Sequence, residues 1–495
     1  MVKTVRIVSL SAGTIGEPFV AHEVKIGVKR LEDMGLRVSF GAHALKGRDY
    51  IKAHPEDRAA DLIEAFSDPD VDMILCAIGG DDTYRLLPYL FDGGRLQQAL
   101  CDKVFLGFSD STINHLMLHK LGLKTFYGQS FLADVCELEN DMLPYSRHFL
   151  EELITAGRIR EIRPSEVWYE ERKAFDESQI GIPRIRHANR GFELLQGAPV
   201  FRGKILGGCL ESMYDIFNND RYPDTVSLCG QYGLFPSPED WEGRILLLET
   251  SQEQPDPALY EKMLLALKRF GLFDRVAGVL AGKPMDEKYA EEYKKLLVRV
   301  IDRPELPILF NVNVGHATPR CIIPFGVPAV ADAEKQCIRF EYPEDYSCRE
   351  SELSPALLEE LIRLSEDWEA ENSCRGYRRN EAADIEGNRV FLAEEGEETV
   401  GYLFGHRELA KNASSVMPDG TPFFEVEELY VKPRLRSRGI GQALFRFAER
   451  AVAGEADYIL LSTATKNWKA ILHFYLEELG MDFWSARLFR KVEKP

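Results

Sequence analysis

The segment Val104–Gly122, VFLGFSDSTINHLMLHKLG, reads as a short apolar strand, a tight turn at Ser109 and a helix. Apolar runs and amphipathic, helix-like stretches alternate before it: runs at 5–10, 36–40 and 73–78, and helix-like stretches at 20–34 and 56–67. This alternation predicts a parallel sheet covered by helices, and therefore an α/β fold. Such sheets bind ligands beyond the carboxyl ends of their strands, so the turns after Ile78 and Phe108 are expected to carry function.

Ser109 is a candidate nucleophile, because a strand-to-helix turn exposes a serine hydroxyl beside the amides of the first helical turn. The alternative is a serine that only caps the helix. A nucleophilic serine needs a base, and a further group that orients the base. Glu249 closes the apolar run RILLLE, and His316 lies in the turn NVGHATP. Taken singly, Glu249 reads equally as a solvated or helix-capping residue and His316 as a surface residue.

Taken together, these segments resemble the LD-carboxypeptidase and microcin C immunity family of serine peptidases over residues 1–345. G-F-S-D-S-T, a strand ending in L-E, and G-H-A-T-P follow one another here in the order found in the family. The resemblance implies a triad of Ser109, Glu249 and His316 that needs no metal or other cofactor. It implies a flavodoxin-like parallel-sheet lobe followed by a smaller α/β carboxyl lobe, and a homodimer formed through this domain.

The same resemblance implies an oxyanion hole made by the backbone amides of Asp110 and of Gly80 or Asp81. The loop that contains Gly80 reads AIGGDD, whereas murein-recycling members of the family carry an arginine and a G-G-Y-G-like turn there. This difference favours the microcin-immunity branch, whose members resemble hydrolases of the bond between an aspartate and a nucleotide. The expected substrate is therefore a small peptidyl- or aminoacyl-nucleotide.

Three residues are candidates for binding this substrate. Trp168 and Phe192 lie in a segment rich in charge and proline that reads as a flap, and their rings are candidates for stacking on a nucleobase. The family's stacking residue is usually a tryptophan, so core packing is the alternative for Phe192. Glu211 follows Gly207-Gly208-Cys209-Leu210, which matches a family motif that lines the cleft.

A second domain is expected to begin near Ser354. Residues 346–353 are polar and read as a linker, and Ser354 followed by Pro355 is typical of a helix start. The predicted organisation is a peptidase domain at 1–345, with lobes at about 1–165 and 195–345, then the linker and a domain at 354–495.

The second domain resembles the GNAT acetyltransferase superfamily over about residues 350–495, which implies a mixed-sheet α/β fold. The segment 436–441, RSRGIG, fits the R-x-x-G-x-G loop, and N-x-x-A, F-Y and G-M elements follow at suitable spacing. Glycines and a helix amino terminus suit a pyrophosphate. The resemblance implies that acetyl-CoA is bound by Arg436, Ser437, Arg438, Gly439, Ile440, Gly441 and Asn467.

Acetyl transfer to an amine needs a base for the amine and an acid for the departing thiolate. The resemblance implies that Tyr475 is the acid. Glu427 and Glu428 precede the glycine turn on a predicted strand, and alternation along the strand sends their side chains to opposite faces. Either is a candidate for the base.

The composition of the chain limits the classes of molecule that it is expected to bind. The formal net charge of −19 gives no basic surface for a nucleic acid polymer. The nine cysteines lack metal-binding spacing, and neither a secretory signal nor a membrane-spanning run is apparent, so a cytoplasmic enzyme is expected.

Three functions remain open from the sequence. The preferred one is a bifunctional self-immunity or detoxification enzyme that hydrolyses microcin C-like toxins and acetylates their amine. The second is a murein LD-carboxypeptidase of cell-wall recycling, fused to an acetyltransferase of separate purpose. The third is a sensor that binds without turnover, which the intact triad disfavours.

Overall fold

The structure of the 495-residue chain is a computed structural model that describes residues 2–342, 346–396, 398–413, 415–436 and 439–485. The chain divides into two compact units, Met1–Glu341 and Tyr342–Pro495. None of the helices in the described residues is long and apolar enough to cross a membrane.

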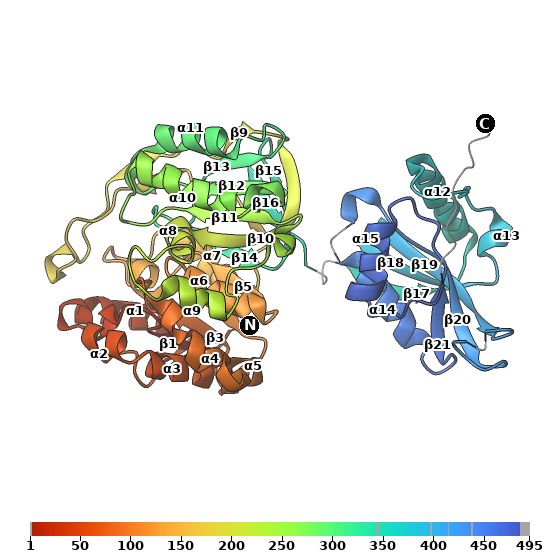
Figure 1. The fold of residues 1–495 in the computed structure, drawn as a ribbon, viewed down its shortest axis with the longest axis horizontal. Helices are drawn as coiled ribbons and strands as arrows, with labels where there is room; N and C mark the ends of the chain where they lie inside the picture. The colour runs from red at the N-terminus through yellow and green to blue at the C-terminus, as the bar shows by residue number, and fades with distance from the viewer. Residues whose placement is uncertain (1, 343–345, 397, 414, 437–438, 486–495) are drawn as a thin grey trace. The chain divides into compact units, whose positions relative to one another are not determined.

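The first unit contains a six-stranded sheet with the order β14-β5-β4-β3-β1-β2 (Figure 1). Strands β1 to β5 run parallel in the flavodoxin-like order 2-1-3-4-5, so the predicted parallel sheet is confirmed. The strands are β1 (Thr4–Val8), β2 (Arg37–Phe40), β3 (Met73–Cys76), β4 (Val104–Gly107), β5 (Thr125–Tyr127) and β14 (Ile323–Phe325). The helices of this lobe are α1 (Ala21–Asp33), α2 (Arg48–Ala53), α3 (Pro55–Ser67), α4 (Leu87–Phe91), α5 (Arg95–Ala99), α6 (Ser111–Lys120) and α7 (Pro144–Ala156).

The second sheet of this unit has eight strands in the order β6-β16-β15-β10-β11-β12-β13-β9. Its parallel core is β10 (Val200–Cys209), β11 (Ile245–Glu249), β12 (Gly278–Gly282) and β13 (Ile308–Val312). The other strands are β6 (Glu161–Ile162), β9 (Glu193–Gln196), β15 (Pro328–Asp332) and β16 (Cys337–Phe340). The helices are α8 (Leu210–Asp215), α9 (Thr225–Gln231), α10 (Pro257–Arg269) and α11 (Ala290–Ile301).

The two lobes exchange strands, which differs from the predicted division at residues 165 and 195. Strand β6, from the amino-terminal side, pairs with β16 in the second sheet, while β14 returns to pair with β5 in the first. Backbone pairing between distant segments leaves no mark in local composition, so the sequence alone could not reveal this exchange.

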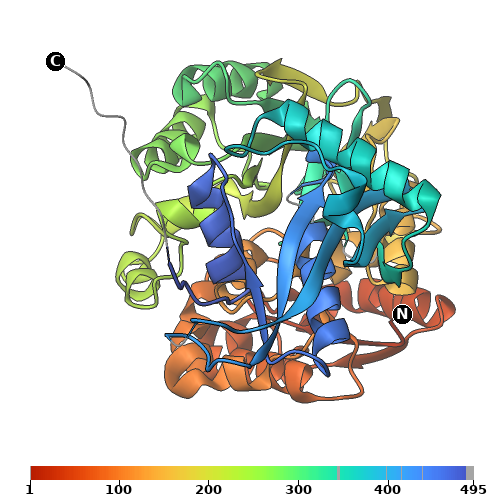
Figure 2. The same ribbon diagram turned by 90° about the vertical axis from the view of Figure 1, so that its right-hand side faces the viewer.

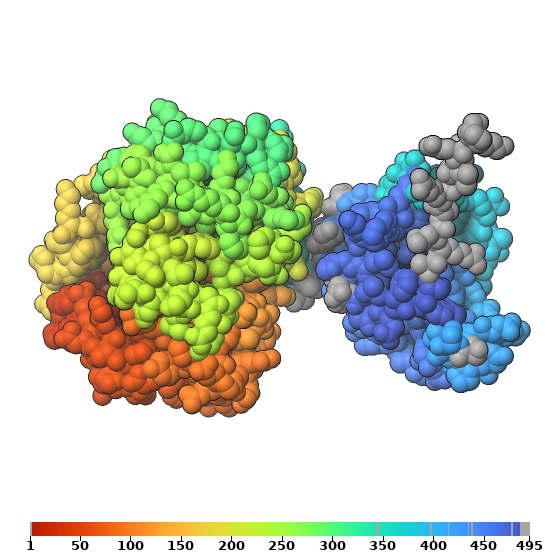
Figure 3. All heavy atoms as spheres, viewed as in Figure 1, coloured from red at the N-terminus to blue at the C-terminus, as the bar shows by residue number. Residues whose placement is uncertain are grey.

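The segment 165–190, the part of the predicted flap that contains Trp168, connects to both lobes. Its strands β7 (Val167–Tyr169) and β8 (Arg186–Ala188) form a separate hairpin. Arg172 and Arg184 bind the carboxylate of Glu137 in the first lobe at 2.8 and 2.7 Å, and the amide of Glu171 donates to Asp286 in the second. In Figure 3 the yellow flap lies along one side of the red and green lobes.

The second unit is built on one five-stranded sheet with the order β17-β18-β19-β20-β21. All neighbours are antiparallel except β20 and β21, which makes the sheet mixed, as predicted. The strands are β17 (Ser347–Ser351), β18 (Arg389–Glu395), β19 (Glu398–Leu409), β20 (Pro422–Val431) and β21 (Tyr458–Leu461). The helices are α12 (Pro355–Glu371), α13 (Ala382–Ile385), α14 (Ile440–Val452) and α15 (Trp468–His473) (Figures 1 and 2).

The predicted linker at residues 346–353 is mostly a strand. Residues 347–351 form β17, which pairs along its whole length with β18. Polar residues are common on edge strands, where they discourage pairing with other chains. A polar edge strand therefore has the composition of a linker, and only its pairing distinguishes the two.

Helix α12 begins as the sequence predicts. The hydroxyl of Ser354 accepts a hydrogen bond from the amide of Leu357 at 3.2 Å, and Pro355 takes the first helical position. The apolar face, which includes Leu357, Leu361 and Leu364, packs on one side of the five-stranded sheet. The cap thus fixes the start of α12, the helix that covers one face of the sheet.

Replacing Ser354 with alanine should lower the unfolding free energy of the second unit by about 1 kcal/mol, because one helix amide loses its cap. Scanning calorimetry of the full chain would show its transition at a lower temperature and the transition of the first unit unchanged. Ser354→Asp, which keeps a capping oxygen, is the matched control. Equal stability of the alanine and aspartate variants would contradict the role of the cap.

Candidate active site

Ser109 stands between β4 and α6 in a constrained turn. Its φ of 66° lies in the left-handed region, which is uncommon for residues other than glycine. Its amide donates to the Tyr127 hydroxyl at 3.1 Å, and the Thr112 hydroxyl donates to its carbonyl at 2.7 Å. These bonds hold the strained backbone in a conformation that presents the hydroxyl at the carboxyl edge of the first sheet.

The structure brings Ser109, His316 and Glu249 together. Nε2 of His316 lies 3.0 Å from Oγ of Ser109, and Nδ1 lies 2.8 Å from Oε2 of Glu249. None of the three residues is more than 8% exposed. Gly315 has a φ of 83°, and a side chain there would overlap the carboxylate of Glu249, so a glycine must precede His316.

Tyr127, at the end of β5, is a part of this site that the sequence analysis missed. Its hydroxyl donates to Oε1 of Glu249 at 2.6 Å while accepting from the amide of Ser109. Burial, reinforced by the charge of Glu249, raises the pKa of Tyr127 well above its usual value, so the hydroxyl stays protonated. The available signal was its position at the carboxyl end of the strand next to β4.

For the candidate oxyanion hole, the structure distinguishes Gly80 from Asp81, the two alternatives predicted beside Asp110. The amide of Asp81 donates to Oγ of Ser11 at 3.0 Å, which excludes Asp81 as a free donor. In the described part of the chain the amides of Gly80 and Asp110 have no hydrogen-bond partner. Gly79 lies against Ser109, since a Cβ at position 79 would be 2.6 Å from Cβ of Ser109 and 3.2 Å from the Asp110 amide. Gly80 and Asp110 are the two amides left to face a developing oxyanion.

The side chain of Asp110 holds the glycine loop in place. Its Oδ2 accepts hydrogen bonds from the Ser11 hydroxyl at 2.6 Å and from the amide of Thr83 at 3.0 Å. Burial raises the pKa of Asp110 to about 6, because desolvation outweighs these two bonds. The carboxylate therefore clamps the loop to the nucleophile turn at a cost in stability when it ionises.

Both rings that were predicted to bind the substrate are enclosed. Trp168 is 9% exposed and stacks on His187, with ring centroids 4.4 Å apart, and Lys283 lies over its ring. Phe192 is 5% exposed and packs in the core. A ring that stacks on a nucleobase needs a free face, which neither ring offers in this structure.

Glu211 lies in the first turn of α8. Its carboxylate accepts a hydrogen bond from the amide of Ser251 at 2.8 Å, just beyond Glu249. Burial raises the pKa of this carboxyl. The bond supports the end of β11, which carries Glu249.

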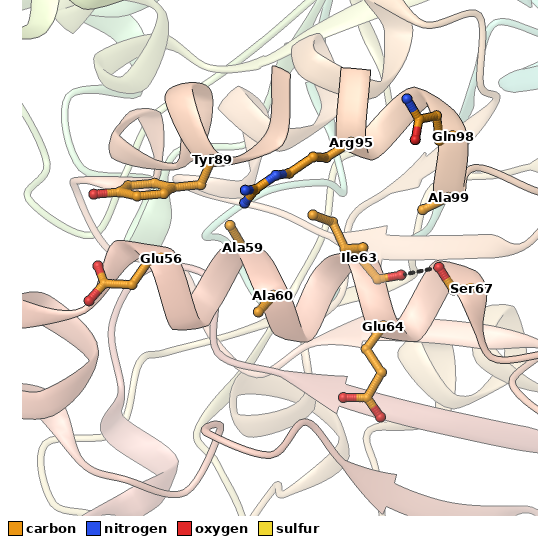
Figure 4. Close-up of a pocket in the computed structure, with 10 residues that line it drawn as sticks. All are labelled: Glu56, Ala59, Ala60, Ile63, Glu64, Ser67, Tyr89, Arg95, Gln98 and Ala99. Atoms are coloured by element: carbon orange, nitrogen blue, oxygen red, sulfur yellow. Dashed lines mark hydrogen bonds between the residues drawn. The ribbon is translucent and has the colours of Figure 1, made fainter. Parts of the chain in front are cut away.

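A hollow on the outside of the first lobe is unrelated to this site. It has a volume of about 590 Å³ and lies between α3 and the α4–α5 segment (Figure 4). Its lining contains Ala59, Ala60 and Arg95 but none of the predicted site residues.

The second unit has an opening in its sheet at the predicted cofactor loop. Strands β20 and β21 pair only from Phe423 to Val426 on β20, which continues to Val431 without β21. Glu427 is an extra residue in the pairing with β19, a β-bulge that lies where the two strands separate. The end of β20 therefore has no strand neighbour on the side of β21.

The cofactor loop meets this opening at the start of α14. Gly439 has a φ of 82° and open space around it, which suits a backbone that approaches a pyrophosphate. Ile440 is buried in the core, so only its backbone is available, and Gly441 lies in the first helical turn. The described residues fit acetyl-CoA in this respect.

Of the other predicted cofactor residues, Arg436 is held in an ion pair and Asn467 is exposed. The Arg436 guanidinium forms a bidentate ion pair with Glu371 at 2.7 and 2.8 Å, and so braces the loop against α12. Asn467 is exposed at the start of α15. Ser437 and Arg438 lie outside the described residues.

The structure separates the roles open to Glu427 and Glu428. Oε2 of Glu428 accepts hydrogen bonds from the Tyr402 hydroxyl at 2.8 Å and from Nδ2 of Asn380 at 2.9 Å. Burial raises the pKa of Glu428. Glu427 is exposed and lies 3.6 Å from Nδ1 of His406. Both line a cavity of about 700 Å³ together with Asp384.

Tyr475 lies half-buried in the π-helical turn Phe474–Glu478 that follows α15 and packs on the core of this unit. Burial raises its pKa to about 12. A tyrosine with this pKa keeps its proton at neutral pH, as an acid for a thiolate must.

The pKa of Asp110 predicts how stability depends on pH. Because the folded state raises this pKa from an ordinary 3.8 to about 6, the folded protein holds the proton more tightly and loses stability as pH rises from 4 to 7. Relative to Asp110→Asn, the unfolding free energy should fall by about 2 kcal/mol over this range. Urea unfolding at several pH values measures it, and a difference that does not vary with pH would refute the assignment.

Comparisons with known proteins agree with this organisation. Residues 5–128 match the LD-carboxypeptidase N-terminal domain, residues 202–330 the LD-carboxypeptidase C-terminal domain, and residues 355–481 the acetyltransferase (GNAT) family.

Individual relatives match the first unit. The chain is similar to a crystal structure of an MccF-like protein from Streptococcus pneumoniae in complex with AMP, with 62% identity and a TM-score of 0.69 over 69% of this chain and 99% of that one. The microcin C7 self-immunity protein MccF of Escherichia coli is 24% identical over 63% of this chain and 86% of its own length. A probable murein peptide carboxypeptidase of Bacillus subtilis is 25% identical over 62% and 84%, respectively. The chain therefore belongs to the LD-carboxypeptidase family that includes MccF, and it carries a GNAT acetyltransferase domain at its carboxyl end.

Proposed function

We propose that the first unit is a serine hydrolase that cleaves the acyl bond of aminoacyl- or peptidyl-nucleotides. The observation that carries the proposal is the continuous chain of hydrogen bonds from Ser109 through His316 to Glu249, at 3.0 and 2.8 Å. The nucleotide is suggested by the AMP held by the MccF-like relative that is 62% identical. A structure of MccF itself contains aspartyl sulfamoyl adenosine.

The reaction has two stages. Oγ of Ser109 attacks the substrate carbonyl as its proton passes to Nε2 of His316, and the resulting oxyanion faces the amides of Gly80 and Asp110. His316 then protonates the leaving nitrogen, so the carbon–nitrogen bond breaks and the acyl group stays on Ser109. Water then gives a proton to His316 as it attacks this ester, and His316 passes the proton to Oγ of Ser109 as the acid is released. Glu249 stabilises the imidazolium at each stage.

Hydrolysis of a murein peptide is the second candidate for this unit. It is supported by the similarity to a probable murein peptide carboxypeptidase, and the same triad would serve it. The AIGGDD loop at residues 77–82 and the nucleotide in the more similar relative favour the first candidate.

We propose that the second unit transfers an acetyl group to a primary amine, and that this amine belongs to the same class of toxin. Acetyl-CoA supplies the acetyl group as a thioester. Glu428 accepts the proton of the amine, directly or through water, since its pKa is raised and its Oε2 is fixed by Tyr402 and Asn380. Tyr475 provides the proton for the thiolate. Since both reactions would inactivate the same toxin, the fused protein would act as a self-immunity or detoxification enzyme.

Replacing Ser109 with alanine should abolish hydrolysis, lowering kcat by about 10⁴-fold or more because the attacking oxygen is lost. Aspartyl sulfamoyl adenosine and a murein tetrapeptide are incubated separately with the unaltered protein and with the variant, and products are measured by mass spectrometry. Cleavage of only the nucleotide supports the first candidate, and cleavage of only the tetrapeptide supports the second. Absence of cleavage of both by the unaltered protein would refute the hydrolase assignment.

Replacing Glu428 with glutamine should lower the rate of acetyl transfer by about 10²- to 10⁴-fold. Because the base must be ionised, activity of the unaltered enzyme falls as pH drops through the raised pKa of Glu428, and the variant loses this dependence. Release of the CoA thiol is followed with aspartyl sulfamoyl adenosine as acceptor, in the Ser109→Ala background so that the acceptor survives. Glu427→Gln is the matched control, and a larger loss in that variant would reverse the assignment.

A further inference from the structure

The triad depends on a segment that crosses between the two sheets of the first unit. Residues 313–322 leave β13 in the second sheet and enter β14 in the first, and His316 lies within this crossing segment. The amide of Cys321 donates to the carbonyl of Asn313 at 2.7 Å, which closes the segment into a loop. The position of His316 relative to Ser109 therefore depends on how this loop is held against the first lobe.

Arg320 is the side chain that holds the loop from within. Its Nη2 donates to the carbonyl of His316 at 3.3 Å and to the hydroxyl of Thr318 at 3.2 Å. Its Nη1 donates to Oδ1 of Asp134 at 3.0 Å, and both side chains are at most 5% exposed. A single guanidinium thus joins the backbone of the triad histidine to a carboxylate of the opposite lobe.

The other end of this connection is fixed to the first sheet. Asp134 lies in the π-helical turn Phe131–Val135, and its Oδ2 accepts from the amide of Ser130 at 3.0 Å. The same turn is tied to the strand before the glycine loop, because the amide of Leu132 donates to the carbonyl of Ala77 at 2.9 Å. Asp134 therefore offers Arg320 an anchor that cannot shift independently of the nucleophile's sheet.

A ring contact completes the arrangement. The guanidinium of Arg320 lies over the ring of Phe108, 4.8 Å from its centroid. The ring of Phe108 meets the imidazole of His316 edge to face, with centroids 5.0 Å apart. Phe108 immediately precedes Ser109, so Arg320 contacts the supports of both the nucleophile and the base.

We infer that Arg320 and Asp134 are positioning residues of the hydrolase: together they fix the carbonyl of His316, and hence the imidazole, against Ser109. The inference rests on the triad of the proposed function. Arg320 is suited to this task because its planar fork donates in several fixed directions at once, whereas a lysine ammonium cannot reproduce that geometry. A displacement of about 1 Å at a reacting group is enough to cost about 100-fold in rate.

The two possible roles of the Arg320–Asp134 pair, structural or positioning, lead to different expected results. Replacing a buried pair with apolar residues of similar size often leaves stability unchanged. In the double variant Asp134→Leu/Arg320→Met, a structural role predicts recovery of both stability and activity. A positioning role predicts that stability recovers while the reactivity of Ser109 does not.

The experiment measures the reactivity of Ser109 without depending on the identity of the substrate. A fluorophosphonate labels a serine activated by its histidine, and the rate of labelling of the full chain is followed by mass spectrometry. Arg320→Lys and the double variant should be labelled about 100-fold more slowly than the unaltered protein, with unfolding midpoints close to it. With aspartyl sulfamoyl adenosine the loss should appear in kcat, with KM nearly unchanged.

The control is Arg6→Met, which removes an ion pair to Asp68 in the same lobe and should leave the labelling rate unchanged. Wild-type labelling rates in a folded Arg320→Lys or double variant would overturn the inference. Absence of Ser109 labelling in the unaltered protein would instead refute the proposed triad, so the two failures are distinguishable.

Discussion

The first unit depends on one constraint, that a serine on one sheet and a glutamate on another must be joined by a histidine held between them. Ser109 follows β4 of the first sheet and Glu249 ends β11 of the second, while His316 lies on the segment that crosses from one sheet to the other. A shift of either sheet would lengthen one of the two imidazole hydrogen bonds. The exchange of β6 and β14 between the sheets limits such shifts, since each strand is bonded into the sheet of the opposite lobe.

Buried polar groups reinforce this constraint because each needs a partner. Tyr127, on the first sheet, donates to Glu249 on the second, so a catalytic carboxylate is satisfied only when the lobes are docked. Within the first lobe, Asp110 and Ser11 hold the glycine loop beside the nucleophile turn. Separating the lobes would leave the buried Tyr127 hydroxyl and Glu249 carboxylate without each other, so docking of the lobes and assembly of the site occur together.

The candidate site of the second unit lies instead at a gap in a single sheet. Its sheet is open between β20 and β21, beside a bulge at Glu427 and a glycine at the start of α14. Gaps in a sheet leave backbone groups without partners, so they persist where a ligand supplies them. The Arg436–Glu371 pair ties the loop to the end of α12, and Nε of Arg436 donates to the carbonyl of Val431 at the end of β20.

The sequence by itself determined the alternation of strands and helices in the first lobe, the start of α12 at Ser354 and, through the family resemblance, Ser109, Glu249 and His316 as candidates. These features are local, because a hydrophobic period, a helix cap and a short motif are each encoded by a few neighbouring residues. The tertiary structure alone decided that β17 is a strand, that Trp168 and Phe192 are enclosed, and that the amide of Asp81 is occupied. It also decided the parts played by Tyr127 and Arg320, which lie far in sequence from the groups they contact. Pairing and burial between distant segments depend on how whole elements pack, and no short stretch of sequence encodes that.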